Sequence, residues 1–236
     1  TISKRFQLIR TVIKWMQKNN EIQFFDFKGF SHEQTSKTEQ VFLSPEQIEE
    51  IAALDLRKRP SLPYIRNLFL LSTFLGVDWV DLAQLTKANL HKTPTGNKYF
   101  KILRRKTKKN MIFSFPPLTN EAEEILNRIK WKIELISLDK ARAHLKEICF
   151  IAGFTQPVTL TFQSGSQEFQ ETRPFFDWIG WKSGRRSFIT NHYLSGKPTA
   201  AIAAAVGHRK HSTTEIYNKA GEAEWVDILL SKGGRK

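Results

Sequence analysis

The chain has 236 residues, of which 40% are hydrophobic and 25% are charged, and this composition indicates a folded protein and excludes an intrinsically disordered one. Lys and Arg number 37 against 23 acidic residues, so the formal net charge is +14, which favours a polyanionic partner such as nucleic acid. The only cysteine, Cys149, excludes an internal disulfide framework. It lies in an apolar run, where we predict a buried core residue. No apolar stretch is long enough to span a bilayer, so we expect no membrane segment.

The first third of the chain contains clear helix signals. Residues 4–18 carry apolar side chains at helical spacing, which predicts an amphipathic helix, and the polar residues 19–39 are typical of a linker. Ser44, followed by proline and by Gln47 three positions on, predicts a capped helix start. A nearly continuous apolar helix is predicted over residues 63–74. Gly76 should end it, and a short helix over 81–85 should follow.

The remaining two thirds alternate between helical and strand-like patterns. Strands over 99–103 and 111–115 are predicted to form a hairpin around the basic run 104–110. A second pair of strands is predicted over 158–162 and 168–172. Helices are predicted over 119–136, 139–152, 185–194, 198–206, 213–218 and 223–230. The predicted fold class is therefore mostly α with small β hairpins (α+β).

The most specific signal lies between residues 182 and 217. This stretch contains K-S-G-R, then V-G-H-R, then T-T-E-I-Y. It resembles the tyrosine recombinase (phage integrase) family, because Lys182, Arg185, His208 and Tyr217 fall at the spacing of that family's catalytic residues. The resemblance extends upstream over about residues 40–220. The S-P-E-Q helix start matches the usual opening of the family's catalytic domain, and Lys106 in the basic hairpin matches its mobile catalytic lysine. The strand-rich insert before Lys182 is most similar to integrases of conjugative transposons and related mobile elements.

The resemblance implies a catalytic-domain fold and a role for each matching residue. Arg185, with Lys182 nearby, would stabilise the phosphate charge in the transition state. Tyr217 would attack the phosphorus atom, His208 would accept or orient its proton, and Lys106 would protonate the leaving 5′-oxygen. The resulting 3′-phosphotyrosine conserves bond energy, so the reaction is expected to need no metal and no other cofactor.

One position departs from the family pattern. Asp78 occupies the place of the family's first catalytic arginine, and a carboxylate there would repel the scissile phosphate. Three interpretations follow. The chain is a catalytically impaired relative that still binds DNA, or it recruits another cation, with Arg66 as one candidate. Alternatively, it is an active enzyme with weaker, partner-dependent catalysis.

The same resemblance implies the domain organisation and the partners. Residues 1–30 are predicted to end a helical core-binding domain that begins upstream of Thr1, with a linker to about 41, a catalytic domain over 42–220 and a tail helix over 221–236. The expected partners are double-stranded DNA and identical subunits, as a dimer to tetramer on DNA, in a cytoplasmic, nucleoid-associated protein. We expect DNA contacts from basic side chains at Arg104, Arg105, Lys108, Lys109, Arg186, Arg209 and Lys210.

The sequence also allows a different class of function. Two short helices flank Ser195 and Gly196, which is a pattern compatible with a helix-turn-helix transcription regulator. The basic hairpin and the spacing from Lys182 to Tyr217 argue against it. The preferred function from the sequence is a site-specific DNA recombinase or integrase.

Overall fold

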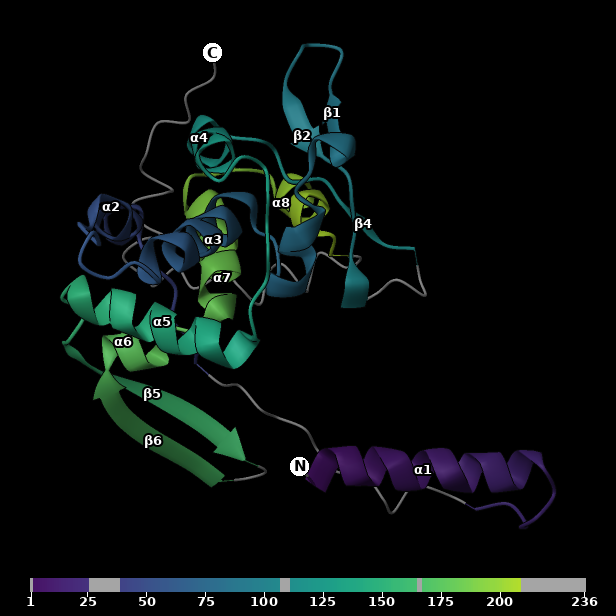
Figure 1. The fold of residues 1–236 in the computed structure, drawn as a ribbon. Coiled ribbons are helices and arrows are strands. Elements are labelled where there is room, and N and C mark those ends of the chain that lie inside the picture. The colour runs from purple at the N-terminus through teal and green to yellow at the C-terminus, as the bar shows by residue number, and fades with distance from the viewer. Residues whose placement is uncertain (1, 26–38, 107–110, 165–166, 209–236) are drawn as a thin grey trace. The chain divides into compact units, whose positions relative to one another are not determined.

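The computed structural model describes residues 2–25, 39–106, 111–164 and 167–208 (Figure 1). Two compact units make up the chain. One contains the residues up to Glu39 together with Thr159–Thr172, and the other contains Gln40–Val158 and the residues from Arg173 onward. None of the helices in the described ranges is long and apolar enough to cross a membrane.

The smaller unit contains α1 (Ile2–Lys18), which confirms the first predicted helix. It also contains most of a hairpin formed by β5 (Pro157–Ser164) and β6 (Gln167–Pro174). Glu39 extends this hairpin, because its backbone N–H donates to the carbonyl of Thr161 and its carboxylate accepts the Thr161 N–H. The predicted strands 158–162 and 168–172 are therefore present, and both are longer than expected.

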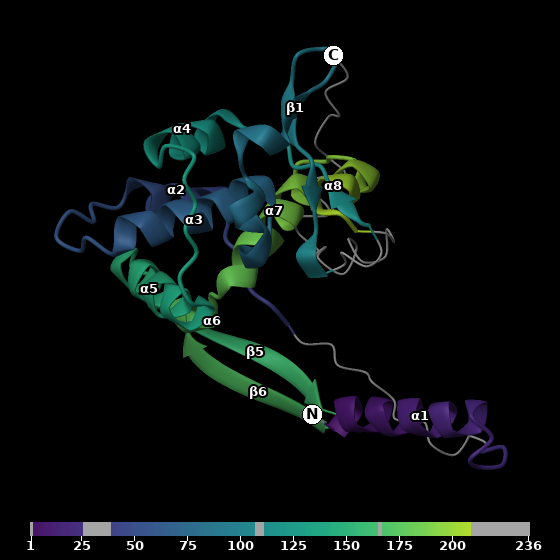
Figure 2. The same ribbon diagram turned by 45° about the vertical axis from the view of Figure 1, so that its right-hand side comes forward.

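The larger unit is built around two crossing helices, α3 (Leu62–Leu75) and α7 (Trp181–Leu194). In both views α4 (Asn120–Arg128) lies on one side of them, and α5 (Leu138–Ile151) with α6 (Phe175–Trp178) lies on the other (Figures 1 and 2). Ten residues of α3 are buried, which explains its continuous apolar sequence. Gly184 permits the close crossing, since a Cβ atom there would lie 2.9 Å from Thr73 Oγ1.

Local signals predicted several helix ends correctly. α2 (Pro45–Ala53) starts at Ser44, whose hydroxyl accepts the Gln47 N–H while the Gln47 side chain accepts the Ser44 N–H. The predicted capping box is therefore confirmed. Gly76 ends α3 in the left-handed conformation, with φ of 63°. The short helix that follows is a 3-10 helix, η1 (Trp79–Gln84), and a second 3-10 turn is η2 (Lys87–Asn89).

Three predicted boundaries were wrong. The helix predicted over 119–136 ends at Arg128, because Lys130 and Trp131 adopt positive φ angles that no helix continues through. Residues 98–100 belong to β2 (Lys98–Phe100), which pairs with β1 (Leu90–Lys92), so the basic hairpin contains only β3 (Ile102–Leu103) and β4 (Phe113–Ser114). α7 begins at Trp181, four residues before the predicted start.

The last described helix is α8 (Thr199–Val206), which ends at Gly207 with φ of 67°. It packs beside β4 (Figures 1 and 2). The helices predicted over 213–218 and 223–230, and with them the tail helix, lie outside the described residues. The observed α-rich architecture with three small two-stranded sheets confirms the predicted fold class for the described part of the chain.

Candidate active site

Asp78 lies at the start of η1, two residues after the glycine that ends α3. Its Oδ2 atom accepts a hydrogen bond of 2.9 Å from Arg104 Nη2 and lies 3.8 Å from Arg185 Nη1. Burial opposes ionisation, but Arg185 and Arg104 outweigh it, so the pKa of Asp78 lies below its ordinary value. The carboxylate is therefore an anion held between two guanidinium groups.

Arg185 projects from the first turns of α7 and is buried. Its Nη1 donates to the carbonyl of Gly76 at 2.7 Å and its Nη2 to the carbonyl of Val206 at 2.6 Å. These two carbonyls lie at the C-terminal ends of α3 and α8, where backbone acceptors are unsatisfied and the helix dipole is negative. Arg185 thus joins the ends of two helices and fixes their position relative to α7.

Arg104 directly follows β3 and is buried, with only 9% of its surface exposed. Its predicted contact with DNA stays a prediction. Its Nη1 donates to the carbonyl of Gly207 at 2.9 Å, opposite the ion pair with Asp78. Asp81 fixes the next residue, because its buried carboxylate accepts the Arg105 N–H at 2.9 Å. Burial raises the pKa of Asp81 above its ordinary value.

His208 directly follows Gly207 at the end of α8. Its N–H donates to the carbonyl of Ala203 at 2.9 Å, so the residue closes the helix end in a Schellman-type turn. Burial, together with the charges of Arg185 and Arg104, lowers the pKa of its imidazole to about 4. At neutral pH His208 is therefore an uncharged imidazole.

A cavity of about 430 Å³ opens beside Asp78. Its walls combine three tryptophans with four cationic side chains and a single carboxylate, that of Asp78. The lining residues are Asp78, Trp79, Val80, Lys106, Leu138, Arg142, Trp178, Gly180, Trp181, Lys182 and Arg186. Of the predicted site residues, Lys106, Lys182 and Arg186 meet here, and a concave surface with this charge attracts an anion. Arg142 was missed, because on the sequence it is an ordinary charged residue of a helix surface.

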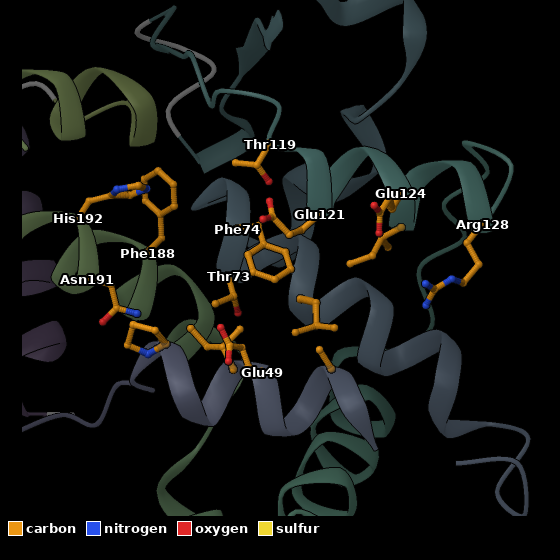
Figure 3. A pocket seen from close by; sticks show the side chains of 15 residues that line it. Glu49, Thr73, Phe74, Thr119, Glu121, Glu124, Arg128, Phe188, Asn191 and His192 are labelled. Carbon is orange, nitrogen blue, oxygen red and sulfur yellow. The ribbon is translucent and has the colours of Figure 1, made fainter. Parts of the chain in front are cut away.

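A second cavity, of about 440 Å³, has the opposite character (Figure 3). It lies between α2, α3, α4 and α7 and has an apolar wall that includes Phe74 and Phe188. Three glutamates, Glu49, Glu121 and Glu124, line it against one arginine, Arg128. None of the predicted site residues lines this cavity, and its negative charge is unsuited to a phosphate.

Arg66 is not part of the Asp78 cluster. Arg66 donates to the carbonyl of Leu54 at 2.6 Å, and burial and the nearby Arg128 lower the pKa of its guanidinium. Arg66 also lies nine residues before the end of α3, which is about 13 Å along a helix. Five predicted site residues lie outside the described residues, namely Tyr217, Lys108, Lys109, Arg209 and Lys210. Within the described ranges, no group of three or more His, Cys, Asp or Glu side chains is arranged to hold a metal ion.

Comparison with solved structures identifies the fold. The XerH site-specific recombinase in a post-cleavage complex with DNA matches 80% of this chain and 51% of its own, with 15% identity and a TM-score of 0.55. A lambda integrase dimer bound to a core site matches 90% of this chain and 70% of its own, with 13% identity and a TM-score of 0.61. The Tn1549 transposon integrase in complex with circular intermediate DNA matches 97% of this chain and 78% of its own, with 13% identity and a TM-score of 0.61.

These similarities confirm the fold that the resemblance implied. The chain adopts the fold of the tyrosine recombinase catalytic domain. It spans about half the length of the XerH structures that it matches. No protein-family model matches the sequence, and no curated protein matches it.

Proposed function

We propose that the chain is a site-specific DNA recombinase that cleaves and rejoins duplex DNA through Tyr217. The observation that supports this most is the convergence of Arg185 and His208, at the ends of α3, α7 and α8, beside a cavity lined with cations. A cluster of this kind suits a phosphodiester, because it supplies fixed positive charge and a neutral proton acceptor.

The proposed reaction needs no external energy. The phenolic oxygen of Tyr217 forms a bond to the phosphorus atom, and the bond from phosphorus to the 5′-oxygen breaks. His208 accepts the phenol proton, and Lys106 donates a proton to the leaving 5′-oxygen. Rejoining reverses both proton transfers, so one phosphodiester is exchanged for another.

A catalytically impaired DNA-binding protein is the second candidate. Asp78 favours it, because the carboxylate lies against Arg185, where a scissile phosphate would have to bind. Binding to duplex DNA would persist in this case, since the cations of the cavity remain. In either case the proposed partners are duplex DNA and further copies of the chain.

The helix-turn-helix alternative is unsupported by the described residues. The two helices concerned are α7 and α8, and α7 is a core helix with eight buried residues. In that reading α8 would enter the major groove, but its sequence T-A-A-I-A-A-A-V has no side chain beyond Thr199 that hydrogen-bonds to a base edge.

The test uses a duplex that the chain itself selects from a random-sequence pool. Affinity for this duplex should fall steeply with salt, by a slope of about −0.9 in log–log form for each phosphate contacted. Nicked versions of the duplex should then trap a covalent protein–DNA adduct in EDTA. Tyr217→Phe should abolish the adduct and leave the affinity unchanged. Tight, salt-dependent binding with no adduct from the parent chain would favour the impaired candidate, and a flat salt dependence would contradict both.

A further inference from the structure

We propose that Arg104 is a second phosphate-binding guanidinium of this site, and that Asp78 is its internal counter-ion, which a DNA phosphate displaces. The inference rests on the proposed function for the cleavage step alone, because phosphate binding by Arg104 can be measured without cleavage. It assigns a role to a buried arginine that the spacing of the family motif does not include.

The position of Arg104 supports the first part. Its guanidinium is held between the Gly207 carbonyl and the Asp78 carboxylate, both at 2.9 Å. The Nε atom is buried and has no hydrogen-bond partner among the described residues. A buried donor without an acceptor is costly, so it is a group for which a ligand oxygen would be favourable. Arg66 shares this feature, but it forms no ion pair with a carboxylate in the part of the chain that the structure describes, and it is hydrogen-bonded to the Leu54 carbonyl.

The position of Asp78 supports the second part. One carboxylate oxygen lies 2.9 Å from Arg104 and 3.8 Å from Arg185, which is the arrangement that an anionic phosphate oxygen would take between two guanidinium groups. The side chain of Asp78 is 26% exposed and lines the cavity, whereas that of Arg104 is 11% exposed behind it. A phosphate that enters the cavity therefore meets the carboxylate first.

The cavity also offers the displaced carboxylate a new partner. Lys106 lines the same cavity, and its charge already acts on Asp78. Lys182 lines the wall as well. Rotation of the short Asp78 side chain toward these ammonium groups would leave Arg104 and Arg185 facing the phosphate. The exchange costs little electrostatically, because each anion stays paired with a cation.

The packing of η1 against β3 explains how a cation from another segment reaches this point. Gln84 of η1 donates to the Leu103 carbonyl of β3 at 3.0 Å, and Asp81 of η1 binds the Arg105 N–H at 2.9 Å. Positions 78 and 104 are therefore neighbours in space, although 26 residues separate them in sequence. The guanidinium of Arg104, directly after β3, can thus occupy the region that an arginine at position 78 would otherwise fill.

The experiment compares the parent chain with Arg104→Ala, Asp78→Asn, the double variant and a control, Arg59→Ala. The control also removes one arginine from an ion pair, since Arg59 binds Glu147 at 2.7 Å on the surface. Each chain is assayed for adduct formation on the nicked selected duplex, for affinity across salt concentrations and for its melting temperature. Arg104→Ala should slow adduct formation about 100-fold or more. Asp78→Asn should speed it about tenfold, and Arg59→Ala should change it less than about threefold.

The coupling between the two residues is the decisive quantity. Because Asp78 masks Arg104, the loss from Arg104→Ala should be larger in the Asp78→Asn background than in the parent. If Arg104→Ala changes the rate of adduct formation no more than Arg59→Ala does, the proposed role of Arg104 is overturned. Slower adduct formation by Asp78→Asn at an unchanged melting temperature would overturn the counter-ion role of Asp78, because Asp78 would then orient Arg104 for catalysis.

Failure of the proposed function is distinguishable from failure of this inference. If the parent chain forms no adduct, the DNA affinities of the variants test the inference. Asp78→Asn should tighten DNA binding about tenfold, and Arg104→Ala should reduce the slope of log affinity against log salt concentration by about 0.9. Unchanged affinities and slopes would overturn the inference. If Arg104→Ala does not fold, Arg104→Lys keeps the charge and removes the bidentate contact. This variant should still lose at least about tenfold in the rate of adduct formation or in DNA affinity.

Discussion

Gly207→Ala tests whether the end of α8 is shaped around Arg104. Gly207 has φ of 67°, a conformation that costs an alanine about 1–2 kcal/mol. A Cβ atom there would also lie 2.6 Å from Arg104 Cδ and 2.9 Å from the carbonyl oxygen of Phe113. Real Cβ atoms do not approach other heavy atoms this closely, so either the arginine or the strand has to move.

The size of the effect can be separated into two parts. The left-handed backbone accounts for about 1–2 kcal/mol, partly offset by the lower entropy of alanine in the unfolded chain. Displacement of Arg104 and of the β4 backbone adds about 1–3 kcal/mol, as for an overpacked core position. We therefore expect Gly207→Ala to lower the free energy of unfolding by about 2–4 kcal/mol in urea denaturation, and to weaken DNA binding.

Gly196→Ala is the matched control. Gly196 has φ of 74°, but an added Cβ atom would have nothing within 4 Å. This variant should lose only about 1 kcal/mol and should bind DNA like the parent. Equal losses of unfolding free energy and equal DNA affinities for the two variants would show that space around Arg104 is not the constraint, and the argument from Gly207 would be refuted.

Three further predictions concern the larger unit. Cys149 is buried, and burial raises the pKa of its thiol to about 12. The thiol should therefore resist a thiol reagent at pH 8 in the folded chain and react at once in denaturant, and fast reaction of the folded protein would contradict this. Ser44→Ala removes the hydroxyl that accepts the Gln47 N–H and should lower the free energy of unfolding by about 1 kcal/mol, whereas Ser44→Asp should restore most of it. The lowered pKa of His208 means that the unfolded state binds the proton more tightly, so stability should fall as pH falls from 6.5 toward about 4. The lowered pKa corresponds to a loss of about 3 kcal/mol in the free energy of unfolding, which partial solvent exposure reduces to about 2 kcal/mol. His208→Gln should remove this part of the pH dependence, measured by urea denaturation at pH 7, 5 and 4.

The sequence predicted the fold best where the signal was local. Ser44 with Gln47, and Gly76 after an apolar helix, specify helix ends through contacts within a few residues. The helix predicted beyond Arg128 failed because the outcome depended on distant partners. The Trp131 ring lies 6.3 Å from that of Phe100 and under the ammonium of Lys87, and no local sequence pattern encodes these contacts with distant segments.

The candidate site shows the same division between local and tertiary information. Spacing selected Arg185 and His208, and the charge of Arg185 acts on His208 in the structure. Lys106 and Lys182 line one cavity. The catalytic roles of these four residues stay predictions. Spacing was not enough to find the partner of Asp78. Arg104 looked like one of several hairpin cations, and its burial depends on the packing of β3 against η1 and α8, which no local pattern encodes.

The arrangement around Asp78 keeps two guanidinium groups at this point of the fold, although position 78 itself carries a carboxylate. The site is assembled where α3, α7, α8 and β3 end near one another, so several backbone positions lie within reach of the same point. Arg185 and Arg104 contribute two positive charges there and Asp78 contributes one negative charge, which leaves a net positive cluster. The carboxylate at position 78 then has a consistent physical role. Without an anion between them, two buried arginines that both approach the same carboxylate oxygen would repel each other and destabilise the folded state.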